Sequence, residues 1–299
     1  YEAPPAIVSM FLGSDLMGVL EALEAKSPYD GGVEATMELG ADVLPTFPKD
    51  TTDRNRTSPF AFTGNKFEFR MLGSSFSIAG PNIIINTIVA EELDQLATRL
   101  EKAEDFTKEL NHVIRKVIRE HKRIIFNGNG YDESWVREAE KRGLLNLRCA
   151  PDALPHMTDP KNIALFVKHK VFSEAEVRSR TEIMLENYCK VLSIEALTML
   201  EMVKKDILPA TYSYIKRLSD TAASARSLCP DLTCESEIKM VSKLSSLCNC
   251  LYVKADNLDK AVIGAKTYAD PAEAASYYRQ YVFAAMQELR AVADEIEGM

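Results

Sequence analysis

Apolar residues recur every three or four positions along most of the chain after Pro81, the spacing that gathers them on one face of a helix. Two such series follow one another between residues 89 and 117. They are Val89, Leu93, Leu96 and Leu100, then Phe106, Leu110, Val113 and Val117. The pattern predicts two successive helices here, and nearly everything beyond Lys170 also reads as helix.

The last sixty residues carry the most regular spacing in the chain. Two heptad-like seams flank the short turn Tyr-Ala-Asp at 268–270. The seams are Val241, Leu244, Cys248, Leu251, Ala255, Leu258, Val262 and Ala265, then Tyr278, Val282, Ala285, Leu289, Val292 and Ile296. They predict an antiparallel helical hairpin, whose seam packs either inside one subunit or between subunits.

Capping residues and prolines suggest where the helices begin and end. Ser-Glu-Ala-Glu at 173–176 fits a capping box, and Pro209 is expected to end or kink the helix that follows. Asp270 is a candidate cap with Pro271 in the first helical position. Ser134 is a candidate cap for a short helix carrying Trp135, and residues 146–160, with three prolines, are interpreted as a connector.

The first eighty residues mix shorter elements. Strands are expected over 6–12, 33–44 and 66–71, and a helix over Asp15–Lys26. The fold class predicted from these elements is α+β, with a helical second half.

Composition narrows the possible functions. The 299 residues carry a net charge of −8, which argues against a nucleic-acid surface. No apolar run approaches the roughly 18 residues that a membrane span requires. The six cysteines are irregularly spaced and indicate free thiols in a reducing cytoplasm; a four-thiolate zinc site at 229, 234, 248 and 250 is a weaker alternative. The four histidines are dispersed, and no nucleophile or glycine-rich phosphate loop is evident.

The stretch 66–70 alternates charged and aromatic residues. As a strand it places Lys66, Glu68 and Arg70 on one face and the two phenylalanines on the other. Judged on period alone, a solvated outer face with exposed ion pairs is favoured. The alternative is a charged face lining a cavity, where the carboxylate could hold a divalent metal and the arginines, with Arg54 and Arg56 upstream, could bind anionic oxygens.

At these residues the sequence resembles glutamine synthetase, and its type III branch in particular. YEAPP at 1–5 is similar to the family's G-Y-E-A-P loop, and DRNRTSPFAFTGNKFEFR at 53–70 is similar to its R-N-R-S segment and E-x-R strand. FNGNGY at 126–131 and the stretch 179–199 resemble type III enzymes as well. The resemblance implies the C-terminal part of the catalytic half-barrel over 1–125 and a helical extension over 126–299.

The resemblance also implies ATP-dependent joining of ammonia to glutamate, with Mg²⁺ or Mn²⁺ as cofactor. Carried over by position, Glu2 resembles the flap glutamate that takes a proton from ammonium. Arg56 resembles the arginine on the transferring phosphate, and Lys66 a basic residue near the nucleotide. Glu68 resembles a metal ligand, and Arg70 the arginine that holds glutamate.

Two departures qualify this resemblance. Bacterial type I enzymes have a further arginine where this chain has Ala61, so the second phosphate-contacting arginine is in doubt; Lys66 and Arg54 are the candidates to substitute for it, and whether either does is left open. The family's other metal ligands lie upstream of Tyr1, so we expect a fragment that is inactive alone.

The expected partners are glutamate, ammonia, ATP and further copies in a dodecamer of two rings, with neither nucleic acid nor membrane. The alternatives are another carboxylate–amine ligase, a phosphagen-kinase-like relative, or a non-catalytic helical assembly module.

Overall fold

The computed structural model describes residues 7–29, 36–37, 47–48, 57–73 and 76–299. Glu2, Arg54 and Arg56, and most of the strand predicted over 33–44, lie outside these residues. The chain divides into two compact units, which are described separately below. The first consists of the residues up to Cys149 together with Pro160–Ser173, and the second of Ala150–Asp159 together with Glu174–Met299.

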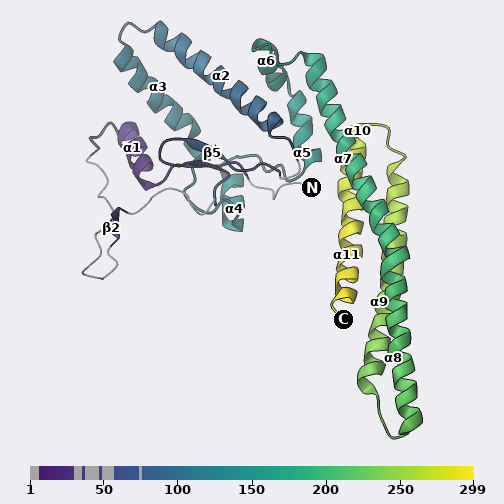
Figure 1. The fold of residues 1–299 in the computed structure, drawn as a ribbon. Helices are drawn as coiled ribbons and strands as arrows, with labels where there is room; N and C mark the ends of the chain where they lie inside the picture. Colours follow the sequence, from purple (N-terminus) through teal and green to yellow (C-terminus); the bar gives the residue numbers. More distant parts are fainter. Residues whose placement is uncertain (1–6, 30–35, 38–46, 49–56, 74–75) are drawn as a thin grey trace. The chain divides into compact units, whose positions relative to one another are not determined.

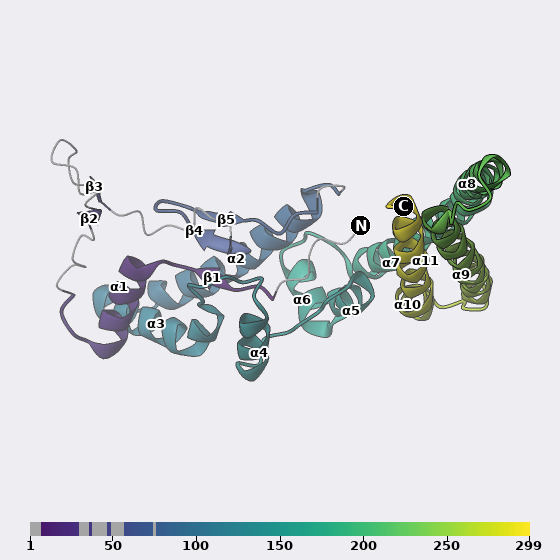
Figure 2. The same ribbon diagram turned by 90° about the horizontal axis from the view of Figure 1, so that it is seen from below.

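The described residues of the first unit form five short strands, three of which lie together among its helices (Figures 1 and 2). The strands are β1 (Met10–Phe11), β2 (Thr36–Met37), β3 (Phe47–Pro48), β4 (Phe60–Phe62) and β5 (Phe67–Phe69). One sheet has the order β1-β4-β5, with β1 parallel to β4 and β4 antiparallel to β5; β2 and β3 pair separately. A bridge from Met10 to Ile125 extends the sheet beyond β1. The strands predicted over 6–12 and 66–71 are therefore present, and both are shorter than expected.

Helices make up most of the rest of the first unit. They are α1 (Ser14–Ala25), α2 (Ala79–Glu101), α3 (Phe106–His121), the 3₁₀ turn η1 (Lys122–Ile124), α4 (Glu133–Lys141) and α6 (Pro160–Lys168). The two helices predicted from apolar spacing are confirmed as α2 and α3, which pack against each other. Their apolar positions differ in burial, because Val113 is buried whereas Val89 and Leu93 are exposed.

The cap of α4 corrects one prediction. Asp132, rather than Ser134, is the N-cap, and its carboxylate accepts the backbone N–H of Ser134 at 2.8 Å. That N–H and the Ser134 side chain lower the pKa of Asp132. An ionised carboxylate at the first turn also suits the helix dipole, which explains why Asp132 occupies the position.

The second unit is helical throughout its described length. Its elements are α5 (Ala150–Ala153), the 3₁₀ turn η2 (Leu154–Thr158), α7 (Glu174–Met202), the π-helical turn η3 (Val203–Ile207), α8 (Leu208–Leu228), α9 (Glu235–Ala265), α10 (Pro271–Tyr277), the π-helical turn η4 (Tyr278–Val282) and α11 (Phe283–Glu297). The proline-rich connector thus forms short helical turns. Asp270 caps α10 as predicted, accepting the N–H groups of Ala272 and Glu273.

Pro209 does not end the long helix, so the first of the two outcomes expected there, an end or a kink, is wrong. The chain passes from α7 through the π-helical turn η3 into α8, where Pro209 lies within the first turn. The Leu208 N–H bonds to Val203 O, five residues back. This wider turn shifts the hydrogen-bond register immediately before the proline, so its missing N–H falls where a new helical segment starts.

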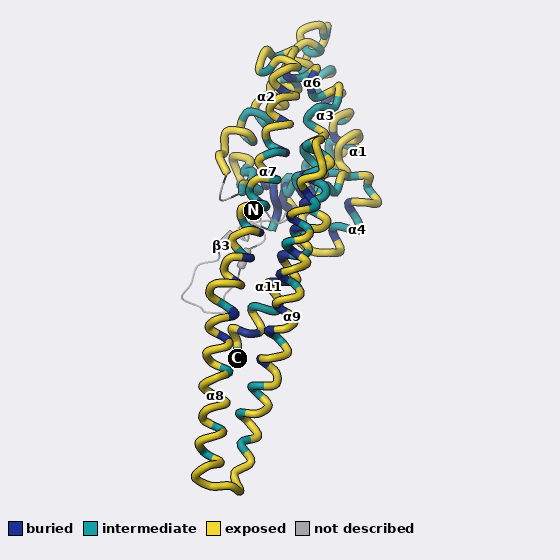
Figure 3. The backbone as a smooth tube through the Cα atoms, turned by 90° about the vertical axis from the view of Figure 1, so that its right-hand side faces the viewer, coloured by how far each residue is buried: buried dark blue, intermediate teal, exposed yellow. Residues whose placement is uncertain are grey.

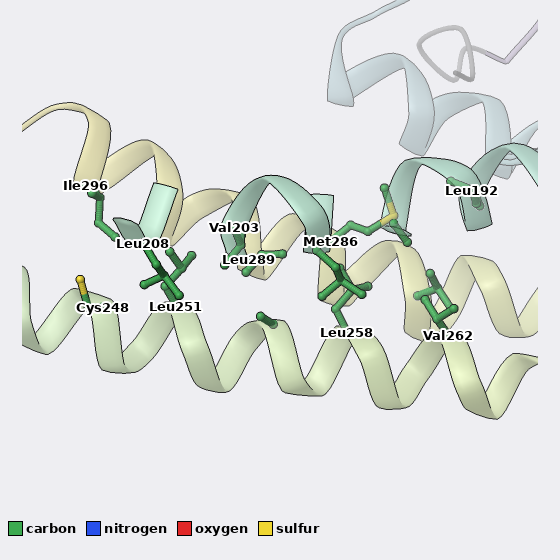
Figure 4. Close-up of a cluster of buried hydrophobic side chains, with 14 of the residues drawn as sticks. Leu192, Val203, Leu208, Cys248, Leu251, Leu258, Val262, Met286, Leu289 and Ile296 are labelled. Atoms are coloured by element: carbon green, nitrogen blue, oxygen red, sulfur yellow. The ribbon is translucent and has the colours of Figure 1, made fainter. Parts of the chain in front are cut away.

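The two predicted seams form the core of the second unit. Every predicted α9 position from Leu244 to Ala265 is buried, and Tyr278, Val282, Leu289 and Ile296 are buried opposite them. Leu251, Leu258, Met286 and Leu289 lie among the clustered side chains of Figure 4. The helices α9 and α11 pack against each other and run in opposite directions, as the hairpin prediction required (Figure 1). Figure 3 shows the resulting alternation of buried and exposed residues along α9.

The fold class is confirmed in its coarse form, a mostly helical chain with a small sheet. The half-barrel stays a prediction. So does the domain boundary between residues 125 and 126, since the two compact units reflect packing and divide the chain elsewhere.

Candidate functional site

The charged face of β5 brings together three of the predicted site residues. Lys66 Nζ lies 3.2 Å from Glu68 Oε1, and Arg70 Nη2 lies 3.1 Å from Glu68 Oε2. Arg70 Nε also donates to Glu68 Oε2 at 3.2 Å. The hydrogen bonds from Lys66 and then Arg70 lower the pKa of Glu68, so the carboxylate stays ionised between two cations.

The three side chains differ in their access to solvent. The exposed fraction is 65% for the Lys66 side chain, 38% for Glu68 and 15% for Arg70. Arg70 is therefore largely covered, whereas Lys66 is open to solvent. A largely covered guanidinium beside an accessible carboxylate is suited to binding a small anionic group in a defined orientation.

The opposite face of the sheet is aromatic, as the alternation predicted. Phe60 stacks on Phe67 with ring centroids 5.6 Å apart and meets Phe69 edge-on at 6.1 Å, and Phe62 lies 5.2 Å from Phe67. Phe67 nevertheless stays 47% exposed, so the aromatic face is covered only in part. The reason is its position on β5, the edge strand of the sheet.

Ala61 lies on the charged face, directly opposite Glu68 in the β4–β5 pair. Residues opposite one another in an antiparallel pair project to the same side of the sheet. Ala61 is completely buried, in the central strand β4. An arginine side chain at this position would have to displace its neighbours, which accounts physically for the small residue.

A divalent cation needs several oxygen ligands. Glu68 supplies one carboxylate of the appropriate kind, and both its oxygens already face cations. Within the part of the chain that the structure describes, no three His, Cys, Asp or Glu side chains gather as a metal site would require. Glu68 thus fits the role of one ligand among several, and the described residues do not form a complete metal centre.

Two other polar features were not singled out from the sequence. Glu91 of α2 accepts hydrogen bonds from Lys168 at 2.7 Å and Gln95 at 2.7 Å, and its Oε2 lies 2.6 Å from His169 Nε2. These contacts, with the Lys168 bond the largest contribution, lower the pKa of Glu91 to about 2. They link α2 to the end of α6, which no sequence spacing could have paired.

The second feature is a groove of about 380 Å³ in the second unit, beside the π-helical turn η3. Its lining includes Lys204, Pro209, Tyr212, Tyr252 and Asp256, and none of the predicted site residues belongs to it.

Comparison with known proteins shows which family the chain resembles. A family model described as the glutamine synthetase C-terminal domain matches residues 109–226. A glutamine synthetase of Butyrivibrio fibrisolvens is 39% identical over 304 residues, covering 100% of this chain and 43% of the relative. A Type-3 glutamine synthetase of Dictyostelium discoideum is 35% identical over 308 residues, covering 100% of this chain and 42% of the relative.

The chain belongs to the glutamine synthetase family. A further relative, a glutamine synthetase of Bacteroides fragilis, is 38% identical over 224 residues, covering 73% of this chain and 31% of its own length. The family resemblance inferred from the sequence is therefore confirmed, including the similarity to a Type-3 enzyme. The chain spans less than half the length of these relatives. No helix within the described residues is long and apolar enough to cross a membrane.

Proposed function

We propose that this chain supplies part of the active site of an ATP-dependent glutamate–ammonia ligase. The observation that carries the proposal is the Glu68–Arg70 pair on β5, found in a chain aligned over its full length with two glutamine synthetases. In the reaction, the γ-phosphoryl group of ATP passes to the side-chain carboxylate of glutamate. Ammonia then attacks that carbonyl carbon, phosphate leaves, and glutamine is formed.

Each proposed residue is assigned to a charge that develops during these reaction steps. Arg70 holds the glutamate and its acyl phosphate, because a guanidinium can bind two oxygens at once. Arg56 contacts the phosphoryl group in transit, where anionic charge must be stabilised. Lys66 lies near the nucleotide, and Glu2 takes the proton that ammonium must lose before it can attack.

Glu68 acts in this proposal as one ligand of Mg²⁺ or Mn²⁺. The cation, when bound, would neutralise phosphate oxygens of the nucleotide. The ionised state of Glu68 supports this role, because a carboxylate must be deprotonated to bind a metal. Lys66 is the more exposed of the two cations that contact Glu68, and we expect its ammonium group to move away from the carboxylate when the metal binds.

The proposal includes the setting of the enzyme. Family membership supports a homo-oligomer, a dodecamer of two rings, in the cytoplasm, with glutamate, ammonia and ATP as substrates. The remaining metal ligands would come from outside the described residues, and the chain by itself would be inactive.

The test is to assay the complete protein that contains this chain. ATP turnover should require both ammonia and glutamate, with one glutamine formed for each phosphate released. Turnover with a different acid or amine acceptor would instead indicate another carboxylate–amine ligase. Absence of ATP turnover with every acid and acceptor tried would favour a non-catalytic helical assembly module.

A further inference from the structure

The loop at residues 126–131, Phe-Asn-Gly-Asn-Gly-Tyr, is hereafter called the Asn-Gly loop. It makes backbone contacts with two segments that lie far away in the sequence. The Phe126 N–H donates to Met10 O at 2.9 Å, and the Gly130 N–H donates to Thr57 O at 2.7 Å. Asn127 Oδ1 accepts the N–H groups of Leu12 at 3.0 Å and Gly13 at 3.1 Å. The loop therefore joins the end of β1 to the segment that leads into β4.

Gly130 is at the closest of these approaches. A Cβ atom at this position would lie 3.1 Å from Thr57 O and 3.2 Å from Pro59 Cδ. The first of these atoms is backbone, so it cannot turn aside as the end of a flexible side chain can. Any side chain at Gly130 would therefore push the segment 57–59 by a few tenths of an ångström.

The base of the loop is held rigidly. The Phe126 ring stacks on the Trp135 ring with centroids 4.1 Å apart, and Trp135 is completely buried. Trp135 Nε1 donates to Ile7 O at 3.4 Å. The Asn-Gly loop is thus anchored to α4, which makes it a fixed support for the segment it touches.

The contacts continue from the loop to the proposed catalytic strand. Segment 57–59 contacts Gly130 through Thr57 O, and its Pro59 O accepts the Arg70 N–H at 2.7 Å. Arg56 directly precedes Thr57 in the chain. The segment 57–59 thus connects Gly130 to the backbone of Arg70, the arginine assigned to the substrate. In the sequence it also follows directly after Arg56, the arginine assigned to the transferring phosphate.

We infer that Gly130 and Asn127 are positioning residues for the ligase reaction, holding the Asn-Gly loop against the segment 57–59, whose Pro59 carbonyl accepts the Arg70 N–H. The inference rests on the proposed function, because that function assigns a role to Arg70. Neither residue needs to touch substrate. Their effect is on the alignment of Arg70, on which transition-state stabilisation depends strongly.

The first test is Gly130→Ala in the complete enzyme. We expect kcat for glutamine formation to fall about tenfold and KM for glutamate to rise, with KM for ATP within about twofold of wild type. The matched control is Gly264→Ala in α9, where a Cβ would approach the Tyr277 hydroxyl instead. The control should lower the thermal midpoint without changing kcat. A Gly130→Ala enzyme that is less heat-stable but keeps its kcat at low temperature overturns the inference.

The second test uses Asn127 and does not depend on how well Gly130→Ala folds. Asn127→Ala leaves two N–H groups without their acceptor and should lower kcat, by about tenfold on the same argument. Asn127→Asp keeps an oxygen in the same place, so its kcat should stay within about twofold of wild type. Equal kcat values for the two variants would overturn the role of Asn127.

The two proposals fail in distinguishable ways. If the wild-type enzyme makes no glutamine, the proposed function is wrong. If the wild type makes glutamine and Gly130→Ala and Asn127→Ala match it in kcat, the function stands and the positioning role is wrong.

Discussion

The helical second unit and the strand-containing first unit are held together in different ways. In the second unit, buried side chains repeat along α9 and α11 at helical spacing, and each helix contributes a continuous stripe to one core. In the first, the buried cluster around Trp135 is smaller, and individual hydrogen bonds join residues 114, 115 and 128 positions apart. The comparison suggests that the second unit contributes chiefly stability, whereas the first holds groups whose exact placement matters for chemistry.

The largest expected effect is on activity and falls in the first unit. Glu68→Ala should abolish metal-dependent glutamine formation in the complete enzyme, by a factor of about 100 or more, because the carboxylate has no substitute among its described neighbours. Assembly should be unchanged. Activity is measured as glutamine formed at saturating substrate, and assembly by size-exclusion chromatography with light scattering.

Arg70→Lys serves as the companion to that variant. An ammonium cannot reproduce the paired contacts of a guanidinium, so the KM for glutamate should rise and kcat should fall, with the oligomer intact. A Glu68→Ala enzyme that retains wild-type activity would refute the metal-ligand assignment, whatever Arg70→Lys does.

The next effect is on stability and falls in the second unit. Leu258 is completely buried in the α9 seam, so Leu258→Ala should lower the free energy of unfolding by about 2–5 kcal/mol. Activity per folded enzyme should hardly change. The measurement is denaturant unfolding monitored by circular dichroism, alongside the glutamine assay.

Ile263→Ala on the same helix is the control for Leu258→Ala. Ile263 is 57% exposed, so its removal should change the free energy of unfolding by about 0.5 kcal/mol or less. If Leu258→Ala reduced kcat as strongly as it reduces stability, the division of roles between the two units would have to be abandoned.

A smaller effect concerns the contact between α2 and α6. The pKa of Glu91 is lowered to about 2 from an ordinary 4.5, so its stabilising contribution is present above pH 4.5 and is lost as the pH falls toward 2. Glu91→Gln should therefore lower the thermal midpoint at pH 7, and the difference from wild type should shrink steadily below pH 4.5. Thermal unfolding over pH 7 to 3 measures it; a difference that grows on acidification would contradict the ion-pair explanation.

The smallest effect is at the cap of α4. Asp132→Ala should lower the thermal midpoint because the bonds to the Ser134 N–H and to the Ser134 side chain are lost together with the charge on the helix dipole. Ser134→Ala should lower the midpoint less, because it removes only the side-chain bond. If Ser134→Ala lowered the thermal midpoint more than Asp132→Ala, Ser134 would be the cap, as the sequence predicted.

Much of this molecule follows from its sequence alone. The seams around Leu258 and Leu289 specified their own helices and their own buried face, since both are set by the spacing of near neighbours. Asp270 likewise specified the start of α10. The alternation at 66–70 determined which side chains share a face of β5, because a strand has a period of two. The motif at 53–70 identified the family.

The tertiary structure decided what depends on partners distant along the chain. The helix continues past Pro209 because the π-helical turn η3 shifts the hydrogen-bond register just before the proline. Residue preferences alone did not reveal this turn. Ala61 proved to be a buried position beside Glu68 only once β4 and β5 were paired. The contacts of Gly130 with Thr57 and of Asn127 with Gly13 likewise join segments that no local pattern relates. Local spacing determines which face a residue occupies, and only the folded backbone determines what that face meets.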